Sequence, residues 1–192
     1  TAAVAAFATA KLAQGFIETA SQMEKFQVQL TTLTGSSSEA EKSLEWIKDF
    51  AKTTPYEIAS VTDAFIKLKA YGLDSTKWMK TLGDTASSMG KPLDQAVEMF
   101  ADAVTGEFER LKEFGVKASQ QGDQVAFKWS QNGKDMVLNT ENNASAISDA
   151  LGQIFSRFEG GMENMSKTWE GMMSNLMDHW GSYKEQVMNS GP

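Results

Sequence analysis

The sequence has no cysteine, three prolines and a single histidine in 192 residues. A chain without cysteine cannot form a disulfide framework, a zinc–thiolate site or a cysteine nucleophile. The one histidine, His179, has no second histidine or cysteine nearby with which to bind a metal. No apolar run reaches the roughly 18–20 residues that cross a bilayer, and the alanine-rich start lacks the basic region of a signal peptide. We therefore expect no cofactor, no metal and no stable membrane span.

Acidic residues outnumber basic ones, with Asp+Glu 25 against Lys+Arg 18 and a net charge of −7. An acidic balance argues against a general nucleic-acid binder, so no specific nucleic-acid binding is expected. Hydrophobic residues make up 41% of the chain and charged residues 22%, which is typical of a folded chain with a core. The first residue is threonine rather than methionine, which suggests a piece of a longer protein.

A cluster of carboxylates is the feature of the sequence that could be interpreted as a catalytic site. Glycoside cleavage uses a pair of carboxyl groups in a cleft. The carboxylates that come nearest to such a pair surround Gly106: Asp102, Glu107, Glu109 and Glu113. Arg110 and Lys112 lie among them, which indicates a solvated, ion-paired face. The sequence therefore predicts that the protein is not an enzyme.

The stretch from Pro92 to Gly115 predicts a compact helical corner. Proline suits a first helical position, and apolar residues then recur at i, i+3, i+4, i+7, i+8 and i+11, on one face of a helix. These apolar positions are Leu93, Ala96, Val97, Phe100, Ala101 and Val104. Gly106 ends this helix, and a short second one follows before Gly115.

Three more helices are expected upstream of this corner. A capping box formed by Ser38 and Glu41 begins the first, which ends near Lys52. The second starts near Ile58 and ends at Tyr71-Gly72, where glycine suits a left-handed cap. The third begins at Asp74 or Ser75, which caps it, and ends at Gly90.

Downstream of Gly122, the apolar period changes from 3.6 to 2. Asn132-Gly133 is the strongest short signal for a hairpin turn. With these two as the loop residues, Trp129 lies opposite Met136 and Phe127 opposite Leu138, all on one side of the ribbon. A lone hairpin is marginal in water, so we expect this side to lie on helices.

Long helices are expected at both ends of the chain. The first runs from about residue 2 to residue 33, with a coiled-coil-like spacing of apolar residues: Phe16, Met23, Phe26, Leu30 and Leu33, with Thr19 also on the seam. The last begins at Thr140–Asn143 and continues nearly to the end, with a kink or break at Gly160-Gly161. Its seam is rich in methionine and offers candidate interaction residues: Met162, Met165, Trp169, Met172, Leu176 and Trp180. Packing within the chain, self-association and contact with a tube or chaperone protein all remain open for this seam.

These elements predict a mainly α fold with a compact helical core and one small β-hairpin, flanked by long N- and C-terminal helices with coiled-coil-like seams. We expect an N-terminal arm at residues 1–35, a core at 36–140 with the hairpin at 124–138, and a C-terminal arm at 141–192. The predicted core residues are large and apolar: Phe65, Leu68, Leu82, Phe100, Val104, Phe108, Leu111, Phe114, Phe127, Trp129, Met136 and Leu138.

The stretch GKPLDQAVEMFADAVTGEFERLKEFGVKAS resembles the conserved N-terminal-region domain of bacteriophage and prophage tail tape measure proteins, and so do the upstream segments in the same order. The resemblance covers roughly residues 26 to 140 and carries no active-site residues. It implies a structural component of a phage tail, which sets tail length during assembly, occupies the tail tube lumen of the virion and is made in the bacterial host cytoplasm. The implied partners are the tail tube protein, tail assembly chaperones and tail-tip proteins.

An alternative is a secreted or membrane-active helical protein. Trp169-Glu170-Gly171 matches the W-x-G turn of small secreted helical hairpins, and a pore-forming segment could serve an ejection step. The triplet falls inside the predicted seam, however, and no segment is apolar enough to cross a bilayer alone. We therefore rank assembly first.

Overall fold

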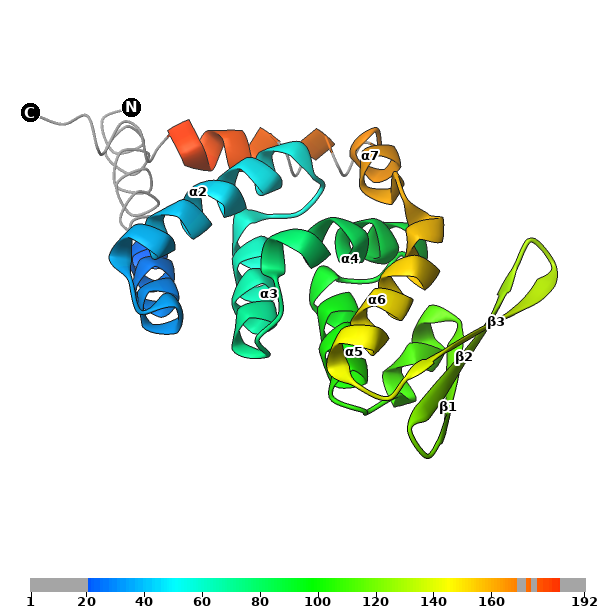
Figure 1. Cartoon of the computed structure of the whole chain (residues 1–192). Coiled ribbons are helices and arrows are strands. Elements are labelled where there is room, and N and C mark those ends of the chain that lie inside the picture. The colour runs from blue at the N-terminus through cyan, green and yellow to red at the C-terminus, as the bar shows by residue number, and fades with distance from the viewer. Residues whose placement is uncertain (1–20, 169–171, 174–175, 184–192) are drawn as a thin grey trace, which may run out of the picture. The chain divides into compact units, whose positions relative to one another are not determined.

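The computed structural model describes residues 21–168, 172–173 and 176–183. They belong to two units, one made of residues 1–62 with 166–192 and the other of residues 63–165. Most of the described elements are helices, and a single small antiparallel sheet accompanies them (Figure 1). The prediction of a mainly α fold is confirmed.

All of the regular elements described in the first unit are helices. Residues 21–34 form a helix, followed by α2 (Ser37–Thr53) and the start of α3 (Ile58–Ala70), and residues 176–183 form another helix. The apolar side of α2 is buried through Ala40, Leu44, Ile47 and Ala51. Phe26 and Leu30 of the predicted N-terminal seam are buried, whereas Leu33 is exposed. Phe16 and Thr19 lie outside the described residues.

The predicted capping box at Ser38 and Glu41 is wrong. Gly35 has a φ of +69°, which turns the chain so that Ser36 is extended and precedes the first helical residue. The Ser36 side chain accepts a hydrogen bond from the Glu39 N–H at 3.4 Å. Ser36 is therefore the N-cap, and α2 begins one residue earlier than expected.

Helices α4 (Ser75–Met89), α5 (Leu93–Val104) and α6 (Ala144–Phe155) pack together in the second unit. The apolar face predicted for α5 is buried along its whole length. Trp78 of α4 lies against Phe100 of α5, with 4.7 Å between ring centroids. Pro92 is the N-cap rather than the first helical residue, because its ψ of 147° is extended.

A 3₁₀ helix, η1 (Glu109–Phe114), leads into a three-stranded antiparallel sheet in the order β1 (Val116–Gln121), β2 (Gln124–Gln131) and β3 (Lys134–Glu141). The β2–β3 register pairs Trp129 with Met136 and Phe127 with Leu138, as the sequence predicts. Strand β1 was not predicted. Its sequence, VKASQQ, contains too few large apolar residues to show a period of 2.

Most of the predicted core positions are buried in this unit. The side chains with little or no exposure are Phe65, Leu68, Leu82, Phe100, Val104, Leu111, Phe114 and Phe127. Phe108, Trp129 and Leu138 are partly exposed. The placement of Met136 in the core is wrong, since 39% of it is exposed. The β2–β3 hairpin extends beyond the helices on which the sheet packs (Figure 1), and Met136 is the third residue of β3, close to the turn of this hairpin.

The break predicted at Gly160-Gly161 is present, but the C-terminal helix is interrupted more than the sequence predicts, from Phe155 onward and again after Ser166. Helix α6 ends at Phe155 and is followed by η2 (Ser156–Phe158), a turn in which Gly160 has a φ of +85°, and α7 (Gly161–Ser166). Arg157 donates a hydrogen bond to the Phe114 carbonyl at 3.1 Å, which holds this break against η1. Because α6 packs on α4, α5 and β3, the division between the units does not follow the expected boundaries at residues 35 and 140.

The start of α7 lies very close to α4. The buried carboxylate of Asp84 accepts a hydrogen bond from the Met162 N–H, at 2.9 Å. A side chain on Gly161 would collide with the Asp84 carbonyl and with Ser88, and one on Gly83 would collide with the Met162 thioether. Met162 is therefore part of this unit's own packing, which is the first of the alternatives left open for the seam.

Replacing Gly161 with alanine should destabilise the protein. The new methyl group would overlap backbone atoms of α4, at a cost of about 1–3 kcal/mol. Gly181→Ala is the matched control: it lies in a helix, no atom lies within 4 Å of the place that its new methyl group would occupy, and alanine there should gain up to about 1 kcal/mol. Urea unfolding measures both changes. An unchanged midpoint for Gly161→Ala would contradict the close contact of α7 with α4.

Candidate interaction surfaces

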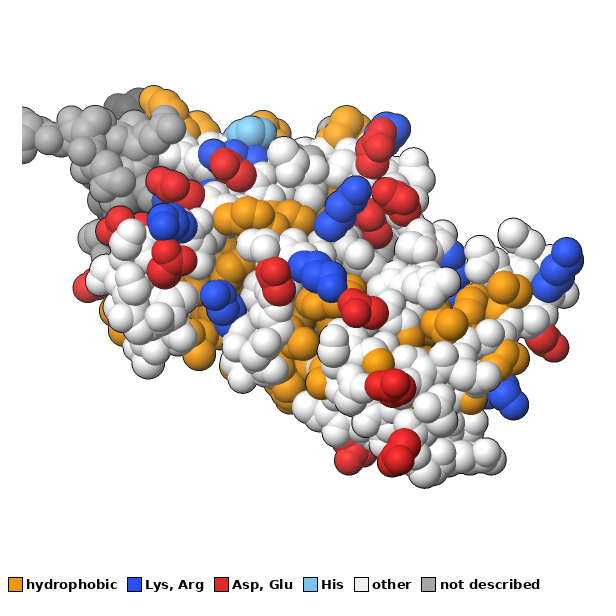
Figure 2. Space-filling model, viewed as in Figure 1, with side chains coloured by type: hydrophobic (Ala, Val, Ile, Leu, Met, Phe, Trp, Pro, Cys, Tyr) orange, Lys and Arg blue, Asp and Glu red, His pale blue; other side chains and the backbone are white. Residues whose placement is uncertain are grey.

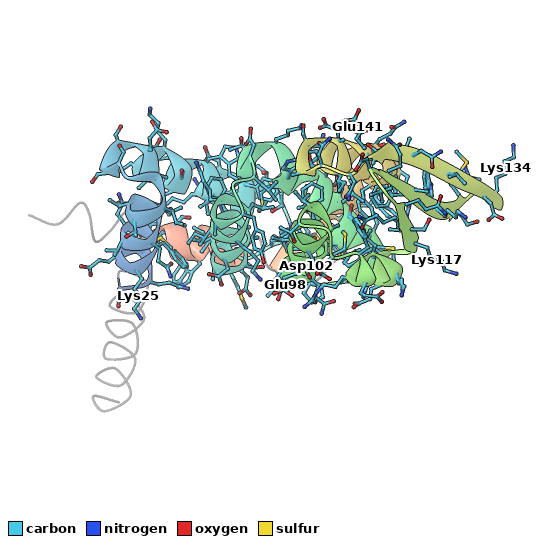
Figure 3. All side chains as sticks on the ribbon, turned by 60° about the horizontal axis from the view of Figure 1, so that its bottom comes forward. Lys25, Glu98, Asp102, Lys117, Lys134 and Glu141 are labelled. Carbon is cyan, nitrogen blue, oxygen red and sulfur yellow. The ribbon has the colours of Figure 1, made fainter. Side chains whose placement is uncertain are left out.

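The carboxylates around Gly106 take part in ion pairs. Arg110 of η1 reaches Asp102 at 2.8 Å and Glu98 at 3.2 Å, and Lys67 of α3 reaches Glu98 at 2.5 Å. Glu98 and Asp102 lie side by side on α5 (Figure 3). The hydrogen bond from Lys67, helped by the charges of Lys67 and Arg110, holds the pKa of Glu98 below its usual value, although partial burial acts in the opposite direction. This network fastens α3 and η1 to α5.

Two of the three remaining carboxylates of this corner are also paired. Glu109 lies 2.6 Å from Lys112, and Glu113 lies 3.3 Å from Lys91. Glu107 is exposed. This arrangement agrees with a solvated, ion-paired face. Across the described part of the chain, no group of three or more His, Cys, Asp or Glu side chains could hold a metal ion.

The C-terminal helical residues of the first unit display an apolar face. Its members are large side chains that are 50–62% exposed: Met172, Leu176, Met177, Trp180 and Tyr183. Four of them follow the spacing i, i+4, i+8 and i+11, which is one side of a helix. The rings of Trp180 and Tyr183 stack with centroids 5.9 Å apart. We call these five residues the exposed apolar face.

Three of the predicted seam residues, Met172, Leu176 and Trp180, belong to this face. Met165 is partly buried, and Trp169 lies outside the described residues, as does the rest of the W-x-G triplet. Among the residues that the structure describes, no helix has both the length and the hydrophobicity that crossing a membrane requires.

Asp178 points in another direction, toward the start of α3. Its Oδ1 accepts a hydrogen bond from the Ile58 N–H at 3.5 Å, and its Oδ2 is buried with no hydrogen-bond partner. The Ile58 N–H is one of the groups that a helix start leaves unpaired. Burial raises the pKa of Asp178 to about 6, and the charge of Glu57 adds to the rise, while the Ile58 hydrogen bond and the charge of His179 oppose it. No local pattern in the sequence signals this contact across 120 residues.

Asp178→Asn should remove a pH dependence of stability. The folded pKa of about 6 exceeds the value of 3.8 for a free aspartate, so the folded state binds the proton more tightly. Stability from this group therefore rises as the pH falls from 7 through 6 and is fully gained near 4. Urea unfolding at pH 7 and pH 5 should show a larger gain on acidification for the parent than for Asp178→Asn. Asp63→Asn, on the exposed side of α3, controls for the loss of one carboxylate, and equal gains in all three proteins would refute the assignment.

The chain is 24% identical over 204 aligned residues to the Mu-like prophage FluMu protein gp42 of Haemophilus influenzae. The alignment covers 97% of this chain and 31% of that protein, so the chain spans about a third of its relative's length. No solved structure matches the chain significantly. The family model for tape measure protein matches residues 14–189, nearly the whole chain, and the chain therefore belongs to the tape measure protein family.

Proposed function

We propose that this chain is a segment of a tape measure protein that sets tail length during assembly and occupies the lumen of the tail tube. Its membership of the family makes it a phage tail structural protein and a virion tail component. The family match across residues 14–189 is the observation that carries the finer proposal.

Helical chain is a natural ruler. Each residue adds about 1.5 Å along a helix, so the number of residues determines a length in space. Helices make up most of the described part of this chain, including residues 21–34 and 176–183 near the ends of the described region. A folded unit such as residues 63–165 would be one module on a longer rod.

The charge of the chain suits a lumen that DNA also passes through. With a net charge of −7, the protein repels a polyanion rather than binding it. On the face that Figure 2 shows, lysines and arginines are interspersed with acidic side chains and form no large continuous basic surface. We infer that the chain leaves passing DNA free. We also infer that it acts by structure and not as an enzyme.

The exposed apolar face supports the proposal of protein partners. Large apolar side chains grouped on one surface are typical of interaction sites, and methionine adapts to more than one partner. We propose that this face is covered in the assembled tail, by a second copy of the chain or by the tail tube protein. Assembly chaperones would cover it before assembly, and tail-tip proteins are further partners.

Tail length should follow the length of the helical segment. In a phage that encodes this chain, an in-frame insertion of about 40 helix-forming residues just ahead of residue 21 should lengthen the tail by about 60 Å. The control places the same residues between Asn132 and Gly133, where the β2–β3 turn can hold them as a loop without lengthening the rod. Electron microscopy of negatively stained virions measures both. Tails of unchanged length in the first variant would refute the proposal that the length of the helical segment determines tail length.

Self-association should depend on the exposed apolar face. Multi-angle light scattering should show that the purified chain associates and that the Leu176→Glu/Trp180→Glu variant is monomeric, because buried carboxylates would oppose the contact. The Gln22→Glu/Gln29→Glu variant adds the same charge at exposed polar positions and should associate as the parent does. A parent chain that stays monomeric at all concentrations would show that this face does not bind a second copy.

A further inference from the structure

Two lysines face each other across the sheet. Lys117 of β1 lies directly opposite Lys128 of β2 in the antiparallel register, and both are exposed. Side chains opposite each other on neighbouring strands are close enough to interact, and like charges in this position destabilise a sheet. The protein therefore carries a local repulsion in its only sheet within the described residues.

No acidic side chain relieves this repulsion. Among the described residues, neither Lys117 nor Lys128 forms an ion pair, although other lysines of this unit, such as Lys67, Lys91 and Lys112, each have a carboxylate partner. The two carboxylates on the same side of the sheet, Asp135 and Glu141, form no ion pair with them either. Figure 3 shows Lys117 pointing out from the sheet, away from Glu98 and Asp102.

The two lysines border a hollow surface. One shallow hollow of about 560 Å³ is lined by both lysines together with Trp129, Met136 and Val137. A second, of about 460 Å³, adjoins it on the outer side of the sheet and shares Lys128 and Val137. Val137, directly opposite Lys128 on β3, is 56% exposed. Figure 2 shows hydrophobic side chains reaching the surface of the hairpin region. We call this surface the lysine groove.

We propose that the lysine groove binds an acidic segment of a partner protein that also carries apolar side chains. Carboxylates of the segment would lie between Lys117 and Lys128 and remove their mutual repulsion, and an apolar side chain would lie on Val137, on the same face of the sheet. Charge complementarity gives both orientation and a fast association rate. The groove would bind such a segment whether or not the chain sets tail length.

The surface fits a peptide better than a nucleic acid. A nucleic acid needs a row of basic residues that follows its phosphates, whereas this groove offers two unpaired lysines and one acidic lining residue, Asp135. The net charge of −7 would repel the rest of a polyanion. Exposed apolar side chains on β3 would be left uncovered by a phosphate backbone but covered by a peptide.

The experiment measures peptide binding and thermal stability together. A short fluorescein-labelled peptide that alternates Glu with Leu is titrated with the full chain, and fluorescence anisotropy gives the affinity. Lys128→Glu places a carboxylate opposite Lys117, so it should raise the melting temperature while it weakens peptide binding about tenfold or more. If Lys128 had only a structural role, the change would alter the melting temperature without weakening peptide binding.

Two variants and one competing ligand complete the design. Lys117→Arg/Lys128→Arg keeps both charges and should bind the peptide as the parent does. Lys69→Glu, an exposed lysine on α3, makes the same charge change away from the groove and should leave peptide affinity within about twofold. A labelled single-stranded oligonucleotide should bind more weakly than the peptide. The proposal is overturned if the peptide does not bind, if Lys69→Glu weakens it as much as Lys128→Glu, or if the oligonucleotide binds more tightly.

Discussion

Close contact of α4 with the end of the second unit is the constraint on which that unit's packing depends. Three glycines make this contact. Gly83 faces Met162, Gly161 faces the Asp84 backbone, and a methyl group on Gly152 would come within 2.7 Å of the Trp78 ring. With the backbones this close, Trp78 can lie between α6 and Phe100, and the Asp84 carboxylate can reach the Met162 N–H. A protein interior tolerates little change in volume, so these small residues determine how closely α6 and α7 pack against α4.

The sequence predicts the parts of the fold that rest on local rules. The apolar face of α5 follows from residues three and four apart, and the β2–β3 register follows from the Asn132-Gly133 turn. Strand β1 was not predicted because its sequence has no alternating apolar pattern. It is a strand because it pairs with β2. The two glycines at 160 and 161 predict a break, but not that α6 already ends at Phe155, because the seam spacing continues past that residue. The hydrogen bond from Arg157 to the Phe114 carbonyl, which holds this part of the chain against η1, joins residues 43 apart.

The same distinction between local patterns and long-range contacts applies to the candidate site residues. The sequence suggests that the carboxylates near Gly106 are paired, because Arg110 and Lys112 lie among them. It cannot show that Lys117 lies opposite Lys128, since that requires β1 to be a strand. Nor can it show that Asp178 accepts a hydrogen bond at the start of α3. Each of these contacts joins residues that are brought together only by the fold, so local patterns in the sequence do not reveal it. The unit that pairs Glu98 and Asp102 of α5 with basic side chains leaves two equal charges facing each other on its sheet, and this contrast points to the sheet as the surface that meets a partner.

The distance along the chain between Asp84 and Met162 has a consequence for synthesis. The sheet joins neighbouring strands through two-residue turns, so it can form as soon as those strands leave the ribosome. The Asp84 carboxylate, and the side of α4 at Gly83 that Met162 covers, must wait for a residue made 78 positions later. Until then this side of α4 stays exposed, and incompletely packed surfaces are the ones that aggregate and that chaperones protect. The start of α7, which is among the last parts of this unit to be translated, is thus the segment that covers this side of α4 and protects it from aggregation.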